Sequence, residues 1–502
     1  MEIYTKQFGI YIAGASAFYY IAWIIYSRIF HPLAKFPGPF WASVSCAWLI
    51  RQVCGGHPER VQKRLHDQYG PIVRVAPNEL IFSDPETIKS IYGVNSGFTK
   101  SDFYHAFRAP VGRFPDHFSS DNQKVHAERR RIVNPVYSLH NVLEAEQYVD
   151  GCIDVLLEQF SDIADKKECI DLHEWSRFFA YDTVGELFFS KMFGFLRSRH
   201  DHLGFMASAD YLIPVMTLSA LMPTYLRPVF MLIGMLFPSL RKAVAALGTL
   251  TDASNQVVAE RVQPGRNEVK SERSDFITKV LQIYFEKGRK VDYDIDDVKT
   301  EAWSAFFGGG DTTAIYLSTT LYYILKDAEI YRRVQEEIDQ ATEEGRIGST
   351  HVTYKEASTL SYLQACIKEA ARIHPVVALP MPRKAPPQGC TLSGTWIPGG
   401  TKVGVNSYVT AHNAEIFGPE PEKFKPERWL EADADKRGRY ILQFGAGSRT
   451  CMGKNIALSE IYKVIPEVLR SYRLELVKTE METTGFWFFK PKTISVRIFR
   501  RT

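Results

Sequence analysis

Residues 444–453 read Phe-Gly-Ala-Gly-Ser-Arg-Thr-Cys-Met-Gly and surround one cysteine with three glycines and one arginine. Glycine adopts backbone conformations that other residues avoid, so this spacing predicts a tight loop whose amides approach the Cys451 sulfur. Such hydrogen bonds stabilise a thiolate and tune a metal that it binds. The residues after Gly453 have helical spacing. We therefore expect the positive end of a helix to face the same sulfur.

A single thiolate ligand suits some metal centres and not others. Structural zinc needs several Cys or His ligands, and no second Cys or His lies near Cys451 in the sequence. A haem iron takes most of its ligands from the porphyrin and needs only one from the protein. The loop therefore indicates a haem-thiolate centre rather than a buried structural thiol.

The spacing of Phe444, Gly447, Arg449, Cys451 and Gly453 resembles the haem-binding loop of the cytochrome P-450 family. Further motifs follow the order that this family shows. The resemblance covers essentially the whole chain and implies a mainly α fold with minor β structure. It also implies that Cys451 is the iron ligand.

Two charged motifs upstream resemble the ion cluster of that family. Glu369 and Arg372 form an ExxR pair on one helix face, and residues 426–429 read Pro-Glu-Arg-Trp. The resemblance implies that Glu369 lies between Arg372 and Arg428 beneath the haem. Trp429 departs from the usual phenylalanine but keeps a large aromatic ring.

Three consecutive glycines interrupt the middle of a long helix that we expect over residues 301–326. Each glycine costs about 0.8–1 kcal/mol relative to alanine, so either another backbone packs against Gly308–Gly310 or a ligand needs the space. Followed by Asp311 and Thr312, the run resembles the oxygen-activation motif of the family. The resemblance implies that the backbone opens there and that Asp311 and Thr312 are catalytic residues that supply protons.

Basic residues resemble those with which the family holds the two haem carboxylates. Arg449 stands two residues before the cysteine, Arg383 follows the ExxR helix, and His126 and Arg130 lie one helical turn apart. His126 stands where the family often has tryptophan, and neighbouring arginines leave alternative registers open. The resemblance thus implies binding of heme b by His126, Arg130, Glu369, Arg372, Arg383, Arg428, Phe444 and Arg449.

The first part of the chain carries no charge from Gln7 to Ser27. About 20 helical residues span the roughly 30 Å apolar core of a membrane. A cleaved signal peptide is the alternative, but no basic cluster precedes this run. Residues 36–39 read Phe-Pro-Gly-Pro and predict a stiff turn. We expect residues 1–35 to form a single-pass anchor in the endoplasmic reticulum and residues 36–502 to form one cytosolic haem domain.

Pattern and composition narrow the fold and partner classes further. Residues 72–75 and 80–82 predict a small hairpin, residues 120–330 are mostly helical, and the last third mixes helices with short strands. Residues 205–245 are apolar and proline-rich, which fits either a buried helix pair or a lid that rests on a membrane. A net charge of +4 argues against nucleic acid as a partner. Seven scattered cysteines indicate reduced thiols.

The haem loop looks most like that of filamentous-fungal microsomal members such as pisatin-demethylase-like enzymes. This implies a monooxygenase that inserts one oxygen atom into an apolar small molecule, in a tailoring step of secondary metabolism. NADPH-cytochrome P-450 reductase is the implied partner, since the chain has no flavin or nicotinamide motif. A reductase-independent haem-thiolate isomerase or dehydratase of oxygenated lipids is the alternative, and a haem sensor or carrier is another. The Asp311–Thr312 pair favours the oxygenase.

Two further roles, reductase docking and substrate contact, are assigned to side chains from their positions in the sequence alone. Cations at the thiolate side are expected to face outward and steer an acidic reductase, at Arg129, Arg131, Lys454 and Lys463. Apolar residues are expected to form a large aromatic substrate cavity. They are Phe103, Phe107, Phe114, Phe118, Trp303, Phe306, Phe307, Val376, Val377, Ala378, Leu379, Phe486, Trp487 and Phe488.

Overall fold

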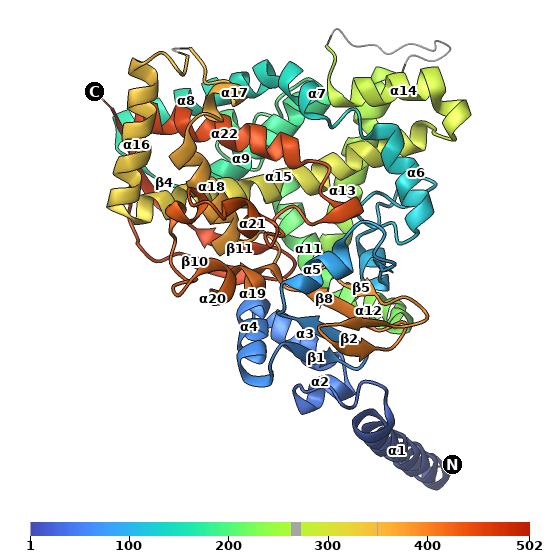
Figure 1. Cartoon of the computed structure of the whole chain (residues 1–502). Coiled ribbons are helices and arrows are strands. Elements are labelled where there is room, and N and C mark those ends of the chain that lie inside the picture. The colour runs from blue at the N-terminus through green and yellow to red at the C-terminus, as the bar shows by residue number, and fades with distance from the viewer. Residues whose placement is uncertain (1, 263–272, 349, 502) are drawn as a thin grey trace.

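The computed structural model describes residues 2–262, 273–348 and 350–501. Of the two expected domains, residues 1, 263–272, 349 and 502 therefore lie outside the described residues. The fold is mainly α with small sheets, as the sequence predicts (Figure 1). Its helical elements are α1 (Glu2–Ile25), η1 (Tyr26–Phe30), α2 (Phe40–Val44), α3 (Ala47–Cys54), α4 (Pro58–Tyr69), α5 (Glu86–Tyr92), η2 (Asp102–Phe107), α6 (Gln123–Val133), α7 (Leu139–Glu144), α8 (Glu146–Lys166), α9 (Leu172–Phe189), α10 (Phe195–Ser198), α11 (Phe205–Leu221), η3 (Thr224–Leu226), α12 (Arg227–Gly234), α13 (Pro238–Arg261), α14 (Phe276–Val291), α15 (Ile295–Lys326), α16 (Ala328–Glu343), α17 (Tyr354–Ala357), α18 (Ser361–Ile373), α19 (Ser407–Ala411), α20 (Ala414–Phe417), η4 (Pro426–Trp429), α21 (Ala434–Gly438), η5 (Gly447–Arg449) and α22 (Lys454–Ser471).

Helix α15 runs through the middle of the molecule (Figure 1). Asp294 caps its N-terminus and forms a reciprocal capping box with Asp297. The helix packs along α9 and also contacts α13, α18 and α22. The predicted long helix is therefore confirmed, and it begins several residues earlier than its apolar pattern indicated.

The largest sheet has the strand order β1-β2-β8-β5-β3. Its first two strands form the predicted hairpin, with Ile72 opposite Phe82. Strand β8 adds in parallel to β2, and β5 then pairs antiparallel with both β8 and β3. The strands are β1 (Ile72–Ala76), β2 (Glu79–Phe82), β3 (Thr99–Lys100), β4 (Cys169–Asp171), β5 (Arg383–Lys384), β6 (Cys390–Leu392), β7 (Thr395–Ile397), β8 (Lys402–Val405), β9 (Tyr472–Leu476), β10 (Glu482–Gly485), β11 (Phe489–Thr493) and β12 (Ser495–Arg500).

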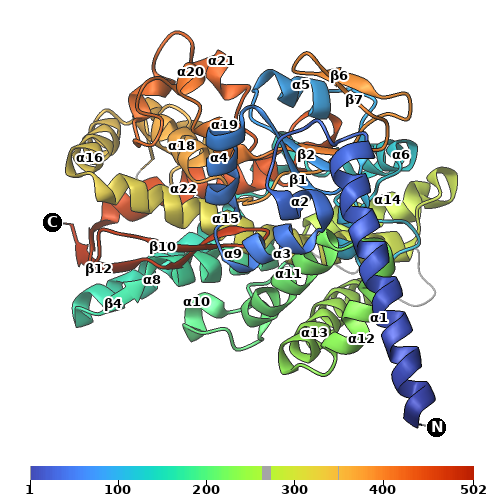
Figure 2. The same ribbon diagram turned by 90° about the horizontal axis from the view of Figure 1, so that it is seen from below.

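Helix α1 projects from the body (Figures 1 and 2). The large apolar side chains that the structure describes between Phe8 and Ile21 are exposed. Residues Ile10–Phe30 are long and apolar enough to cross a membrane, by length and composition. The end of this segment is tied to the first sheet. The buried Arg74 guanidinium donates to the Ser27 carbonyl at 2.9 Å and to its hydroxyl at 3.1 Å. The angle between α1 and the body is thus set by specific hydrogen bonds as well as by the proline-rich turn.

The apolar stretch 205–245 divides into two parts with different surroundings. Phe205, Leu212 and Met216 of α11 are buried in the main core, as a buried helix predicts. In contrast, residues 225–237 expose large apolar side chains, of which Leu236 is 76% exposed. Helix α12 lies at the end of the body from which α1 projects (Figures 1 and 2). The buried-pair alternative is therefore wrong for this second part.

Candidate functional site

The cysteine loop folds back on itself immediately before α22. The Cys451 backbone N–H donates to the Phe444 carbonyl at 2.8 Å and closes the loop. Gly445 and Gly447 have φ values of +68° and +63°, where side chains other than glycine are strained. A Cβ atom on Gly447 would also collide with the Tyr92 carbonyl. The two glycines are therefore required by the path of the loop.

The Cys451 thiol lies at the start of α22 and is exposed, unlike the buried thiols of Cys152 and Cys366. Desolvation by the surrounding protein raises its pKa, whereas backbone N–H groups of Gly453 and Lys454 and the charge of a nearby arginine act in the opposite direction. These groups stabilise the thiolate form. Among the described residues, no three His, Cys, Asp or Glu side chains gather as metal ligands.

The ExxR motif lies on α18 and forms a closed ion cluster with η4. Glu369 and Arg372 are both fully buried, and the two side chains form a bidentate pair with N–O distances of 2.8 Å. Arg428 lies 3.3 Å from the same carboxylate. Helix α18 and η4 thus bring together the three charges that the sequence predicts as one cluster.

Trp429 contributes a contact that the usual phenylalanine cannot make. Its indole N–H donates to Glu369 at 2.8 Å, and the backbone N–H of Lys425 donates to the other carboxylate oxygen at 2.9 Å. The carboxylate therefore has hydrogen bonds on both oxygens, as a buried charge requires. The departure from the family pattern is compensated by a polar contact, which the sequence did not reveal.

The predicted carboxylate-binding residues converge from three separate segments: α6, β5 and the cysteine loop. Arg449 donates to the Ser120 carbonyl at 2.8 Å, and Arg130 donates to the Ser448 carbonyl at 3.2 Å. Arg383 is buried and donates to a tyrosine hydroxyl at 2.6 Å. Within the described part of the chain, none of these three arginines forms an ion pair.

His126 joins this group without a partner of its own. It is 2% exposed, and neither ring nitrogen has a hydrogen-bond partner among the described residues. Burial and the charges of Arg449 and other neighbours lower its pKa, so the ring is neutral. Buried donors and cations without anions are the arrangement that a ligand with two carboxylates fits. The residues present therefore fit a haem beside Cys451.

The presence of glycine at the three positions in α15 has two different explanations. A Cβ atom on Gly309 would lie 2.7 Å from Val184, and one on Gly310 would collide with the Tyr181 ring, so α9 packs closely there. A Cβ atom on Gly308 would meet nothing within 4 Å. The structure thus shows both close packing, at Gly309 and Gly310, and free space, at Gly308. The close packing is made by side chains of α9 rather than by its backbone. The helix continues through the glycines without a break.

The two predicted catalytic residues have contrasting surroundings. Thr312 is half-buried, and its hydroxyl donates to the Gly308 carbonyl at 2.7 Å. Asp311 is buried and forms ion pairs with Arg177 at 2.8 Å and Lys490 at 3.3 Å. Burial would raise the pKa of Asp311, but the two cations outweigh it and lower the pKa. The sequence analysis did not predict either cation. Arg177 could have been found, because an arginine within a largely apolar helix needs an acidic partner.

The predicted substrate contacts are only partly brought together. The ring centroids of Phe103, Phe107 and Phe118 lie 5.3, 5.6 and 5.8 Å from that of Trp487. Phe114 instead forms a cation–π contact with Arg129 of α6, whose guanidinium carbon lies 3.8 Å from the ring centroid. The cluster of four aromatic rings thus joins the loop after β3 to the C-terminal strands.

The remaining residues predicted to contact substrate also differ in their surroundings. Phe306 stacks on Phe189 at 4.6 Å in the core, while Trp303 stacks on Phe307 at 4.8 Å. Among the residues after α18, Val377 is half-buried, and its neighbours are buried. Phe306 is therefore a core residue rather than a cavity residue.

The four cations that were predicted to face the reductase differ in their exposure and ion pairing. Arg131 and Lys454 are exposed as expected. Arg129 is engaged by Asp292 at 3.0 Å. The prediction is wrong for Lys463, which is fully buried and forms ion pairs with two acidic residues. Its position on the inward face of α22 explains the difference.

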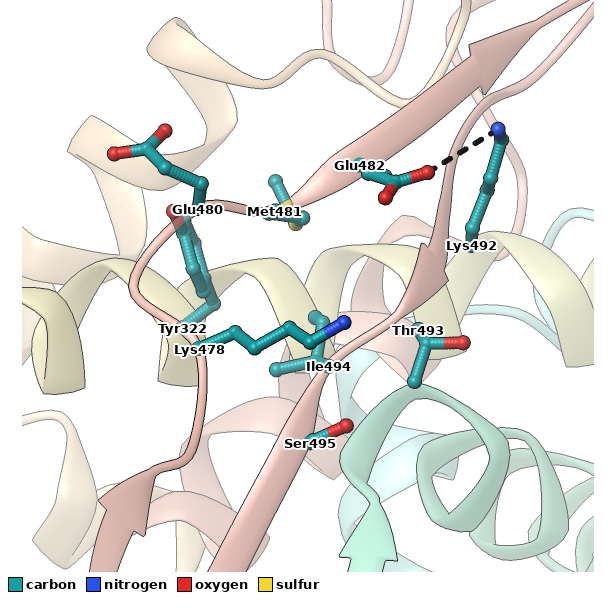
Figure 3. Close-up of a pocket in the computed structure, with 9 residues that line it drawn as sticks. All are labelled: Tyr322, Lys478, Glu480, Met481, Glu482, Lys492, Thr493, Ile494 and Ser495. Carbon is teal, nitrogen blue, oxygen red and sulfur yellow. Dashed lines mark hydrogen bonds and ion pairs between the residues drawn. The ribbon is translucent and has the colours of Figure 1, made fainter.

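A separate pocket of about 250 Å³ lies between the C-terminal strands (Figure 3). Its walls carry both charges, and Glu482 pairs with Lys492 at 3.4 Å. It shares no residue with the candidate site. The residues that line it are Tyr322, Lys478, Glu480, Met481, Glu482, Lys492, Thr493, Ile494 and Ser495.

A helical fold, a glycine-bounded loop that presents the Cys451 thiol and a group of cations without ion pairs among the described residues fit the class of haem proteins whose iron has one cysteine ligand. The cytochrome P-450 family model matches residues 35–496, and the chain belongs to this family. A cytochrome P-450 monooxygenase of Penicillium aethiopicum, gsfF, is 40% identical over 96% of this chain and 95% of that protein. A pisatin demethylase of Fusarium vanettenii is 31% identical over 94% and 90%. A monooxygenase of Emericella nidulans, cicH, is 32% identical over 96% and 97%.

Proposed function

We propose that this chain is an NADPH- and reductase-dependent monooxygenase that inserts one oxygen atom from O2 into an apolar small molecule. The tailoring of a fungal secondary metabolite is the proposed context. The observation that carries the proposal is the accessible Cys451 thiol at the start of α22, beside N–H donors that favour its thiolate form. The similarity to fungal monooxygenases over nearly the whole chain supports it.

Cys451 would hold the iron of heme b, and His126, Arg130, Arg383 and Arg449 would hold its two carboxylates. When bound, the haem supplies reductive activation of dioxygen. The closed cluster around Glu369 keeps α18 and η4 in place, while Phe444 closes the cysteine loop. Each role rests on a contact that the chain already makes or on a basic side chain that has no anionic partner among the described residues.

Thr312 is the residue best placed to hold a proton donor. Its half-buried hydroxyl lies one turn from Gly308, where the helix faces open space. Asp311 contributes through its ion pairs with Arg177 and Lys490 rather than as a free carboxylate. The aromatic rings around Trp487 would exclude water and contact an apolar substrate.

The membrane and the reductase are the proposed partners. Residues 1–35 would anchor the protein in the endoplasmic reticulum, and residues 36–502 would form one haem domain on the cytosolic side. The exposed apolar side chains of residues 225–237 lie at the same end as α1 and support a second contact with lipid. Exposed Arg131 and Lys454 would face the acidic reductase.

Substrate-dependent NADPH consumption in the presence of the reductase tests the proposal. An oxygenase consumes NADPH and yields oxygenated product, with O2 as the source of the inserted atom. A haem-thiolate isomerase or dehydratase converts an oxygenated lipid without NADPH, and a sensor or carrier shows no turnover. Product formation that is indifferent to both NADPH and reductase would contradict the proposal.

A further inference from the structure

A glutamate of helix α4 is buried without a close partner for its charge. Glu59, the second residue of α4, is 0% exposed, and neither carboxylate oxygen accepts a hydrogen bond from another described residue. His57 and Arg60 place basic nitrogens 3.6 and 3.7 Å from Oε1, which is too long for hydrogen bonds. Their side chains are 41% and 51% exposed. A buried carboxyl group with so little support is costly as an anion.

The second carboxylate oxygen of Glu59 lies against the C-terminal hairpin β10–β11. A Cβ atom on Gly485, the last residue of β10, would come within 2.8 Å of Oε2 and within 3.3 Å of the Ala378 Cβ atom. The Gly485 N–H also donates to the Gly56 carbonyl at 2.5 Å, just before α4. Glycine is therefore required at position 485, because the Glu59 carboxyl group occupies the space that a side chain would fill.

The turn that follows Gly485 carries residues that are predicted to contact substrate. The Trp487 carbonyl accepts a hydrogen bond from the Ala378 N–H at 2.9 Å, and Phe488 forms an isolated bridge with Val377. The Trp487 ring belongs to the cluster of four aromatic rings described above. Glu59 thus contacts the residue at which this turn begins, and Trp487 joins the turn to the predicted substrate contacts.

The groups around Glu59 favour its neutral form. Burial raises the pKa of Glu59 to about 7, and its own backbone N–H and the charge of Arg60 oppose this only in part. Burial, with the charges of Arg60 and of Lys492 from β11, lowers the pKa of His57. Burial raises the pKa of Tyr408 from α19. His57 and Tyr408 are therefore neutral near pH 7, and an ionised Glu59 is drawn towards Arg60 and water, away from the hairpin.

We propose that Glu59 is a positioning residue whose neutral carboxyl group holds the turn with Trp487 in place and whose ionisation releases that turn. This inference rests on the proposed function and adds a pH-dependent regulation of the substrate site. An ionised carboxylate needs hydrogen-bond donors, and Oε2 has none among the described residues. If Arg60 turns inward to compensate the charge, it gives up its 3.5 Å contact with Thr483 of β10. Both movements loosen the hairpin, so the substrate site opens as the pH rises.

Recombination of carbon monoxide with the reduced holoprotein after flash photolysis measures access past Trp487 without any turnover. The rate constant of the unmodified chain should rise with pH along a one-proton curve whose midpoint lies near 7. Glu59→Gln keeps the shape of the side chain but cannot ionise, so its rate constant should stay at the low-pH value of the unmodified protein. Glu482→Gln is the matched control, since this carboxylate lies on the same strand and is 75% exposed. It should keep the curve of the unmodified protein.

Thermal unfolding of the same three proteins gives a second readout that does not need a haem spectrum. The folded-state pKa of Glu59 is raised above the usual value of 4.5, so the unmodified protein should lose stability relative to Glu59→Gln as the pH rises from 4.5 to about 7. Above that pH the difference should stay constant. An unchanged recombination curve in Glu59→Gln, a pH-independent rate in the unmodified protein, or no pH-dependent stability difference would overturn the proposal. If the unmodified chain binds no haem, the proposed function fails, and the unfolding comparison still tests Glu59.

Discussion

Two charge clusters of the molecule are built in opposite ways. Around Glu369, one carboxylate is shared by Arg372, Arg428, the Trp429 indole and a backbone N–H group. Around Arg383, several cations converge without any ion pair in the described part of the chain. The first cluster is complete as the chain folds, whereas the second lacks a negative charge. In this protein the group of like charges therefore fits a ligand site, whereas the balanced group around Glu369 fits a structural one.

Glu369→Gln should have the largest effect on the folded protein. It removes the only negative charge of the complete cluster and leaves two buried guanidinium groups unpaired. Breaking a buried pair in this way costs about 3–5 kcal/mol, so we expect little folded holoprotein. Thermal unfolding and the yield of haem-bound protein measure the loss.

Glu427→Gln is the control for the same motif. This glutamate is 37% exposed in its side chain and pairs with Arg333. Exposed pairs contribute at most about 1 kcal/mol, so the variant should remain folded. Equal stability of the two variants would contradict the distinction between a structural cluster and a surface pair.

Thr312→Ala should leave both clusters intact and affect catalysis alone. Alanine favours the helix, so haem and substrate should still bind and NADPH should still be consumed. We expect product per NADPH to fall roughly 10-fold or more and hydrogen peroxide to rise, because a positioned proton donor is lost. Thr313→Ala, at the buried neighbouring position, controls for changes in the helix. A Thr312→Ala enzyme that stays tightly coupled would reopen the isomerase alternative.

Trp429→Phe should have the smallest effect. It keeps the aromatic ring and removes only the indole N–H bond to Glu369. The carboxylate keeps its other partners, so the expected loss is about 1 kcal/mol in the free energy of unfolding. Trp396→Phe, at a 54% exposed position, should cost less. If the two losses are equal in thermal unfolding, the indole contact does not stabilise the cluster.

The sequence predicted those parts that depend on local pattern. The hairpin over residues 72–82, the long helix and the glycine-rich loop each follow from spacing within one segment. For α11 the sequence left a buried helix and a membrane-facing lid as alternatives. The hairpin, the long helix and the loop could be found because the residues that specify them are neighbours along the chain.

The parts that were missed depend on contacts between distant segments. Glu59 contacts Gly485 only because α4 packs on the end of β10, and no local signal reveals that contact. Asp311 is held by cations from α9 and β11, which only the folded chain brings together. Lys463 was misplaced because the family resemblance places a helix at a surface but does not state which face is buried.

The central claim is that Cys451 is the one protein ligand of a haem iron. The most direct test is the absorption spectrum of the reduced protein with carbon monoxide. The unmodified chain should show the red-shifted band of a thiolate-bound ferrous haem, and so should Cys54→Ala, which alters another exposed cysteine. Cys451→Ala should lack this band, because no other ligand donates comparable charge to the iron. Retention of the band in Cys451→Ala, or its absence from the unmodified protein, would contradict the claim.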